Sequence, residues 1–297
     1  MFTGLSAFPL TPMNESGIDE EAFIRLIQRA ADAKVDSISA LGSTGSYAYL
    51  TREERKRAAT FAVQHANGIP VMVGIGSLRT RDVLQFAEDA QEAGVSAVLL
   101  APVSYQPLTE REVYSLYETV TRSLSIPLCV YDNPRVTHFT FRDELLGEIA
   151  QLPNIGSIKI PPVSSNHDEA KARVDQLRAL IPSHVKIGIS GDWSAAAGLN
   201  AGCDIWYSVL GGLYPEISLR ITRAALTGSA EEALALSEQL EPLWELFRQH
   251  GGLRVIASAA LRLGIGSNPN LPQPIQGLDE KARQQLDEVI QRLALQS

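Results

Sequence analysis

Lysine is rare in this chain of 297 residues, since only six of its 26 Lys and Arg side chains are lysines. One of them, Lys159, lies inside an apolar run that ends at Pro161, near the end of a strand-like segment. A charged amine is costly to bury without a partner. The pattern therefore allows two interpretations: a lysine paired with a carboxylate of a neighbouring strand, or a neutral amine that can form an imine with a ketone. The other five fall in polar helix-like stretches or at the start of a strand-like run, where solvated charges are expected: Lys34, Lys56, Lys171, Lys186 and Lys281.

Two other segments carry groups that such an amine would need. Ser43 and Thr44 lie between two glycines, and a turn of this composition can offer hydroxyl and backbone N–H groups to a carboxylate. Tyr131 ends another apolar run, with Arg135 shortly after it, and its phenol can donate and accept protons. Each segment also has an ordinary structural interpretation. Gly/Ser/Thr turns are common, and a tyrosine at a strand end is often a core residue with a satisfied hydroxyl.

These residues follow strand-like runs that alternate with helix-like stretches. We expect eight strands, at Gly4–Pro9, Val35–Leu41, Pro70–Gly76, Ala97–Pro102, Ile126–Tyr131, Gly156–Ile160, Val185–Ser190 and Asp204–Leu210. We expect helices between them at Asp19–Ala33, Arg52–Ala66, Thr80–Ala93, Glu110–Ser123, Phe141–Gln151, Asp168–Leu180 and Trp193–Ala201. This α/β alternation predicts a (β/α)8 TIM barrel, whose catalytic residues lie at the carboxyl ends of the strands. A doubly wound open sheet is the alternative, but no Gly-rich phosphate turn follows the first run.

The last part of the chain is helical. Helix-like segments occur at Glu216–Leu226, Ala230–His250, Leu253–Leu263 and Asp279–Leu295, with a Pro-rich connector before the last. We therefore predict a barrel domain over residues 1–226 and a helical extension over residues 227–297 that packs on it.

Composition excludes several kinds of partner. The net charge is −8 and the chain has no basic block, which argues against binding nucleic acid or an anionic membrane. No apolar stretch reaches the roughly 18 residues that cross a bilayer. Cys129 and Cys203 lie in apolar runs, as expected for buried thiols in a reducing compartment, so we predict a cytoplasmic protein. We see no His, Asp and Glu spacing typical of a metal site, and we expect none.

Taken in order, the hydroxyl turn, Tyr131 and Lys159 resemble the dihydrodipicolinate synthase / N-acetylneuraminate lyase family of class I, Schiff-base aldolases. The opening Phe8–Pro12 and the helical tail also match, so the resemblance covers essentially the whole chain. It implies a lyase that acts on pyruvate or a related 2-oxo acid through a lysine imine, without a cofactor. It also implies a homotetramer.

The resemblance further implies a role for individual residues. Lys159 matches the lysine that attacks the C2 carbonyl, and Tyr131 matches the phenol that moves protons. Ser43 and Thr44, in the turn that Gly45 closes, match the pair that binds the pyruvate carboxylate, and the first also relays protons to the tyrosine. Two more positions match family residues near the substrate. Tyr207, in the eighth strand, matches a residue whose backbone carbonyl lies near the substrate, and Gly191 matches the glycine of the turn after the seventh strand.

The chain departs from the family at the second-substrate end. Ser46 stands where many members have Glu, and Val136 stands at the usual Arg position, with Arg135 one residue early. The family has a tyrosine in the loop after the fourth strand; in this chain Ser104 occupies that position, and the nearest tyrosine, Tyr105, is one residue later. We therefore expect intact pyruvate chemistry with an unresolved second substrate.

Three functions remain open. The departures favour cleavage of a sugar acid or hydroxy-oxo acid over condensation of pyruvate with aspartate semialdehyde, the reaction of dihydrodipicolinate synthases. The alternative of another class is a non-catalytic barrel that binds a 2-oxo acid, which requires an ion-paired, inert Lys159.

Overall fold

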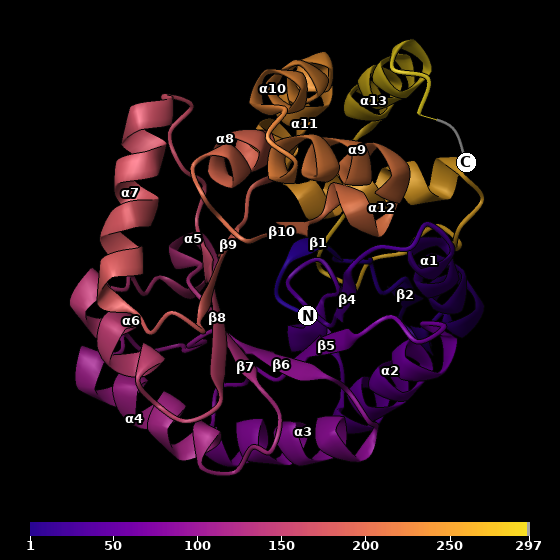
Figure 1. Cartoon of the computed structure of the whole chain (residues 1–297). Coiled ribbons are helices and arrows are strands. Elements are labelled where there is room, and N and C mark those ends of the chain that lie inside the picture. The colour runs from indigo at the N-terminus through magenta and orange to yellow at the C-terminus, as the bar shows by residue number, and fades with distance from the viewer. Residues whose placement is uncertain (296–297) are drawn as a thin grey trace.

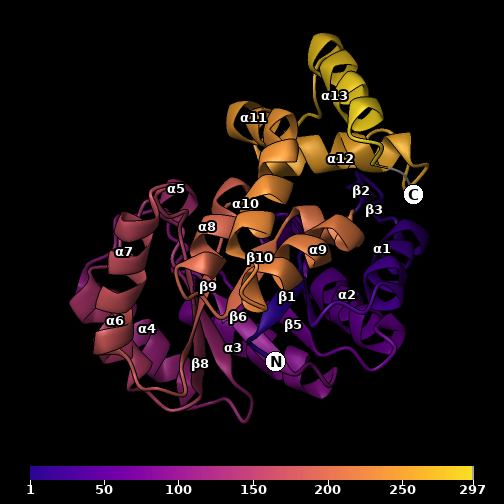
Figure 2. The ribbon, with the colours of Figure 1, turned by 45° about the horizontal axis from the view of Figure 1, so that its top comes forward.

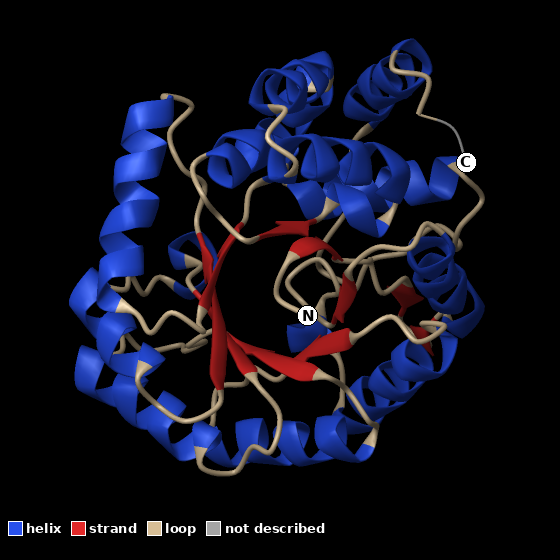
Figure 3. Cartoon of the chain, in the orientation of Figure 1, coloured by secondary structure: helices blue, strands red, loops and turns tan. Residues whose placement is uncertain are grey.

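A computed structural model, which describes residues 1–295, contains a closed barrel of eight parallel strands. Figures 1 and 3 show this ring of strands surrounded by helices. Around the ring the order is β1-β10-β9-β8-β7-β6-β5-β4. The TIM-barrel prediction is confirmed, and each of the predicted strand runs contains or overlaps one barrel strand: β1 (Gly4–Ala7), β4 (Ser37–Ala40), β5 (Val71–Gly74), β6 (Ala97–Leu100), β7 (Leu128–Tyr131), β8 (Ile155–Ile160), β9 (Lys186–Ile189) and β10 (Ile205–Ser208).

Several of the helices between the strands begin at a side chain that caps the first turn. Thr51 and Thr109 each form a reciprocal capping box with the glutamate three residues later, and Asn166 accepts two backbone N–H groups. These bonds satisfy N–H groups that a helix leaves unpaired at its start. The outer helices are α1 (Glu20–Asp32), α2 (Arg52–His65), α3 (Thr80–Glu92), α4 (Glu110–Thr121), α6 (Asp143–Ala150), α7 (His167–Leu180), α8 (Ala195–Asn200) and α9 (Pro215–Leu226).

Several short elements were not predicted. An antiparallel pair, β2 (Met13–Asn14) and β3 (Gly17–Ile18), precedes α1. Helix α5 (Pro134–Thr137) follows β7, and 3-10 turns follow β4, β9 and β10: η1 (Tyr47–Tyr49), η2 (Asp192–Ser194) and η3 (Leu210–Gly212).

The prediction of one helical segment over Ala230–His250 is wrong in detail. The structure has two helices there, α10 (Ala230–Gln239) and α11 (Glu241–His250), which meet at Leu240. Pro242 lies in the first turn of α11, where it has no N–H to donate back to α10, so one helix ends and another begins.

The C-terminal helices cover part of the barrel. α10 packs on α8 and α9, and α11 contacts the η2 turn at the carboxyl end of β9. α12 (Gly252–Arg262) and α13 (Glu280–Arg292) pack on α11 and on each other. Figure 2 shows α11, α12 and α13 grouped beside the barrel. The domain division at residue 226 stays a prediction.

Two apolar cores stabilise the fold. The larger lies between the strands and the outer helices, and the smaller fills the barrel interior. Because parallel strands in such a barrel are buried on both faces, they read as continuous apolar runs. Cys129 and Cys203 are free and buried, as predicted. No helix within the described residues is long and apolar enough to span a bilayer.

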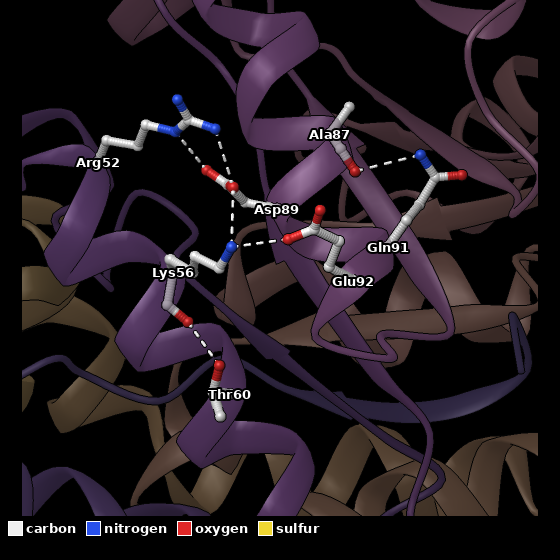
Figure 4. Close-up of polar contacts among 7 residues, drawn as sticks. All are labelled: Arg52, Lys56, Thr60, Ala87, Asp89, Gln91 and Glu92. Atoms are coloured by element: carbon white, nitrogen blue, oxygen red, sulfur yellow. Dashed lines mark hydrogen bonds and ion pairs between the residues drawn. The ribbon is translucent and has the colours of Figure 1, made fainter.

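Charged groups outside the barrel pair with one another. Between α2 and α3, the buried Asp89 accepts from Arg52 Nε at 2.6 Å and lies 3.4 Å from Lys56 Nζ, which is also 2.7 Å from Glu92 (Figure 4). These contacts raise the pKa of the Lys56 amine. Lys56 is therefore a structural surface charge, as the sequence predicts.

Candidate active site

The barrel places the predicted residues at one end. Lys159 is the fifth residue of β8 and pairs in register with Tyr131, the last residue of β7. The turn that carries Ser43 and Thr44 follows β4, which stands four strands from β8 in the ring of eight. The turn therefore follows a strand on the opposite side of the barrel from the strand that carries the amine.

Lys159 is buried among aromatic rings and has no ion-pair partner within residues 1–295. The residue is only 3% exposed. Its Nζ lies 3.8 Å from the ring centroid of Phe8, 4.1 Å from that of Tyr131 and 5.6 Å from that of Tyr207. Burial lowers the pKa of Lys159 to about 7. A large fraction of the amine is therefore neutral near neutral pH, and the structure does not support the ion-paired interpretation.

The turn after β4 depends on an unusual backbone. Leu41 and Ser46, at its two ends, have φ angles of 55° and 52°, a left-handed conformation that costs energy for residues other than glycine. Gly45 lies against the start of the same turn, since a Cβ there would be 2.8 Å from the Leu41 nitrogen. The glycine is thus required by close packing, and Thr44 is buried beside it. Strain of this kind is common where a site is held in a fixed shape.

Tyr131 is protonated at neutral pH. Burial raises the pKa of its phenol to about 12, opposed by a hydrogen bond with the Ser43 hydroxyl. The structure thus brings Ser43 to the phenol. Burial raises the pKa of a second phenol, that of Tyr47, to about 12; Arg55, whose guanidinium lies 5.2 Å from the ring centroid, opposes this rise, and Tyr131 adds to it. Tyr47 was missed in the sequence, because it follows the Gly-Ser-Thr-Gly turn as an ordinary aromatic residue.

Tyr207 fills the barrel interior beside Lys159. Its hydroxyl lies 2.7 Å from Ser157 Oγ, which donates to the Lys186 carbonyl at 3.0 Å, so the phenol donates to Ser157. Cys129 Sγ donates to the same phenol at 3.4 Å. Gly188 leaves room for the ring, since a Cβ there would be 2.1 Å from a ring carbon. The side chain is therefore a fixed wall of the site.

The loop after β9 contributes a buried carboxyl group that the sequence interpretation missed. Gly191, with a φ of 78°, turns the chain so that Asp192 begins η2. Ser208 Oγ donates to Asp192 Oδ1 at 2.8 Å. Burial raises the pKa of Asp192 to about 6, and Ser208, the Leu210 backbone and the charge of Lys159 oppose that rise. The only signal in the sequence was its position after a strand end, next to the predicted Gly191.

The remaining predicted residues lie outside the buried cluster. Arg135 is exposed on α5 and makes no hydrogen bond or ion pair with the described residues, and Val136 beside it is 58% exposed. Tyr105, in the loop after β6, is 89% exposed, whereas Ser104 is half-buried. All four follow strand ends at the same end of the barrel. Within residues 1–295, no cluster of three or more His, Cys, Asp or Glu is placed to hold a metal ion.

Comparison with known proteins identifies the family of this chain. A model of the dihydrodipicolinate synthetase family matches residues 1–293. The 4-hydroxy-tetrahydrodipicolinate synthase of Kosmotoga olearia is 29% identical over 296 residues, 98% of either chain. Among solved structures, a dihydrodipicolinate synthase from Agrobacterium tumefaciens has a TM-score of 0.94 and 46% identity, covering 98% of each chain. A dihydrodipicolinate synthase from Aquifex aeolicus has a TM-score of 0.90 and 25% identity, covering 99% of each. The chain therefore belongs to the dihydrodipicolinate synthetase family and is a lyase of the pyruvate-dependent, class I aldolase type.

Proposed function

We propose that Lys159 forms a protonated imine with C2 of pyruvate, or of a 2-oxo acid that releases pyruvate, and that this imine drives carbon–carbon bond cleavage or formation. One observation carries the proposal: a buried amine with a pKa of about 7 lies over the ring of a phenol that hydrogen-bonds to Ser43 of the hydroxyl turn, and no carboxylate among residues 1–295 is bonded to it. A neutral amine is the nucleophile that imine formation requires.

Each step can be assigned to a group of the site. Lys159 Nζ bonds to C2 while Tyr131 donates a proton to the carbonyl oxygen. Tyr131 then recovers a proton from the nitrogen and donates it again as the hydroxyl group leaves as water. The nitrogen keeps one proton and a positive charge, and Tyr131 is left as a phenolate that accepts a hydrogen bond from Ser43 and is ready to take the next proton.

The carboxylate of the 2-oxo acid binds the turn opposite the amine. Thr44 and Ser43 supply hydroxyl groups there, and the tight turn supplies backbone N–H groups. Holding the carboxylate and C2 at fixed positions converts imine formation into an intramolecular step.

The imine replaces a cofactor as electron acceptor. In a 4-hydroxy-2-oxo acid, the electron pair of the C3–C4 bond moves toward the positive nitrogen and leaves an enamine. The C4 hydroxyl gives its proton to the Tyr131 phenolate and becomes an aldehyde. Because no step needs a metal, we expect activity to survive dialysis against a chelator.

We propose cleavage of a sugar acid or hydroxy-oxo acid as the preferred reaction. Val136 occupies the position of the family arginine, and the neighbouring Arg135 is exposed on α5 without a bonded partner among the described residues. Condensation of pyruvate with aspartate semialdehyde is the second candidate, favoured by the names of the relatives.

We further propose that the protein works in the cytoplasm as a homotetramer on a small-molecule substrate. The two buried free thiols fit a reducing compartment. Three exposed apolar side chains follow neighbouring strands β4, β5 and β6 at the site end of the barrel, as expected for a subunit contact: Tyr49, Leu78 and Tyr105. Sedimentation equilibrium tests the assembly, and a monomer at micromolar concentration would contradict it.

Imine formation is tested by incubating the protein with pyruvate, reducing with borohydride and mapping the adduct by mass spectrometry. We expect one adduct, on the peptide that contains Lys159, and none in Lys159→Ala. Lys56→Ala is the matched control, because Lys56 lies on the outside of the barrel in an ion-pair cluster, and it must keep the adduct. No adduct in the unmodified protein, or one that persists in Lys159→Ala, contradicts the proposal.

The second substrate is tested by comparing two rates. Condensation of pyruvate with aspartate semialdehyde is measured beside pyruvate release from hydroxy-oxo acids and dehydrated sugar acids. Faster condensation would overturn the preference for cleavage and leave the imine intact.

A further inference from the structure

A buried carboxyl group, that of Asp192, lies at the site without a part in the steps above. Asp192 is 2% exposed and Lys159 is 3% exposed. Burial is the main influence on the pKa of both groups; Cys129 and Asp192 also raise the pKa of Lys159, and the charge of Lys159 lowers the pKa of Asp192. Tyr131 also responds to the charge of Asp192. The hydrogen bonds of the backbone place the group in the same region: β9 pairs with β8, and Ser190, two residues before Asp192, donates its N–H and its hydroxyl to the carbonyl of Ile160, the residue after Lys159, at 3.0 Å and 2.7 Å. The carboxyl group therefore lies at the carboxyl end of β9, beside the strand that carries the amine, and is hydrogen-bonded to neither the amine nor the phenol.

Imine formation changes the charge of this region. With a pKa of about 7, only about half of the free amine is charged at pH 7, whereas every protonated imine carries a positive charge at a buried position. A buried charge is costly unless an opposite charge or suitable dipoles accompany it. The faces of Phe8 and Tyr131, 3.8 Å and 4.1 Å from Nζ, supply part of that stabilisation.

The hydrogen bonds around Asp192 favour its ionised form. Ser208 Oγ accepts the N–H of Gly211 at 2.8 Å, so the single hydroxyl proton of Ser208 is left to point at Asp192 Oδ1, also at 2.8 Å. The backbone N–H of Leu210 provides a second donor. Donors that face a carboxylate stabilise its charged form. Burial raises the pKa of Asp192 against these donors, but only to about 6, so the group is predominantly negative at pH 7 and above.

We propose that Asp192, held ionised by Ser208, is a positioning residue that supplies the fixed countercharge of the imine cation at Lys159. This inference rests on the proposed function, because it needs the imine. Asp192 acts through its charge and does not touch the reacting atoms. The negative charge lies on the β9 side of the barrel, away from the turn after β4, so it opposes the cation more than it repels the substrate carboxylate.

The test compares Asp192→Asn with the unmodified protein. Asparagine keeps the shape and an oxygen that accepts from Ser208, but loses the charge. We expect the pyruvate concentration for half-maximal borohydride trapping to rise by about tenfold, which corresponds to about 1.4 kcal/mol of lost charge interaction. The pH midpoint for imine formation must move down, because Asp192 raises the pKa of Lys159.

Asp89→Asn is the matched control, since Asp89 is also buried but lies between α2 and α3. It is expected to lower stability in urea and leave trapping unchanged. Unchanged pyruvate dependence and an unchanged pH midpoint in Asp192→Asn, with trapping by the unmodified protein intact, overturn the inference. Absence of trapping in the unmodified protein instead contradicts the proposed function.

Ser208→Ala decides the matter if Asp192→Asn does not fold. This variant keeps the carboxyl group of Asp192 and removes one hydrogen-bond donor, so the pKa of Asp192 must rise. In a plot of borohydride trapping against pH, the acid limb, where trapping falls off at low pH, must then move to higher pH. A loss of stability with an unmoved acid limb shows a purely structural role and overturns the inference.

Discussion

Replacing the buried lysine with an apolar side chain of similar length should stabilise the protein in a pH-dependent way. Burial lowers the pKa of Lys159 from 10.5 to about 7, which corresponds to about 5 kcal/mol between its charged and neutral forms. The folded state bears this cost wherever the unfolded chain carries the charged amine. Lys159→Met removes the charge and keeps the volume, so about 5 kcal/mol is the upper limit of the gain.

The pH dependence follows from the direction of the shift. Between pH 7 and 10.5 the unfolded chain binds a proton that the folded protein has released, so the stability of the unmodified protein rises with pH in this window. Below pH 7 both states are protonated, and the full cost of burying the charge is present. The gain from Lys159→Met is therefore largest below pH 7 and shrinks as the pH approaches 10.5.

The assay is urea unfolding of both proteins at pH 6.5, 8 and 9.5, followed by circular dichroism. Lys56→Met is the control, because the Lys56 amine is exposed and paired with Asp89 and Glu92. It should be slightly destabilising, with the same difference at each pH. A gain for Lys159→Met that is constant with pH, or that grows toward pH 9.5, refutes the assignment of a depressed pKa to Lys159.

Three further substitutions test the walls of the site. Tyr131→Phe should keep the fold and lower kcat by about 10²–10⁴, as expected for loss of a proton-transfer group, and a kcat within twofold of the unmodified enzyme contradicts that role. Gly188→Ala places a Cβ 2.1 Å from the Tyr207 ring and should cost about 1–3 kcal/mol in urea unfolding. Phe8→Leu removes a ring 3.8 Å from Lys159 Nζ and should weaken pyruvate trapping by about two- to tenfold, measured from its concentration dependence.

The barrel could be predicted because its strands are buried on both faces. Such strands read as apolar runs, and helix-like stretches with capping residues such as Thr51 and Thr109 separate them. Short elements were less accessible. The β2–β3 pair and α5 each span at most four residues, too few for a period to be recognised, and the break at Leu240 depends on a single proline, Pro242.

The surroundings of Lys159 were harder to predict than Lys159 itself. When both faces of a strand are apolar, no alternation shows which side chains point into the barrel. Trp206 and Tyr207 are consecutive and both fully buried, yet Trp206 belongs to the outer core and Tyr207 to the barrel interior. Phe8 presents the same difficulty, since the sequence marks it only as part of an opening motif.

The chemistry of Lys159 therefore depends on what the other strands place around it. Lys56 has the same side chain, but Asp89 and Glu92 raise its pKa. The rings around Lys159 carry no full charge, so burial dominates and its pKa falls. Cys129 and Asp192 oppose that fall only in part, because they act on the amine without bonding to it. A carboxylate placed within bonding distance of Lys159 Nζ would hold the ammonium form and should abolish imine trapping.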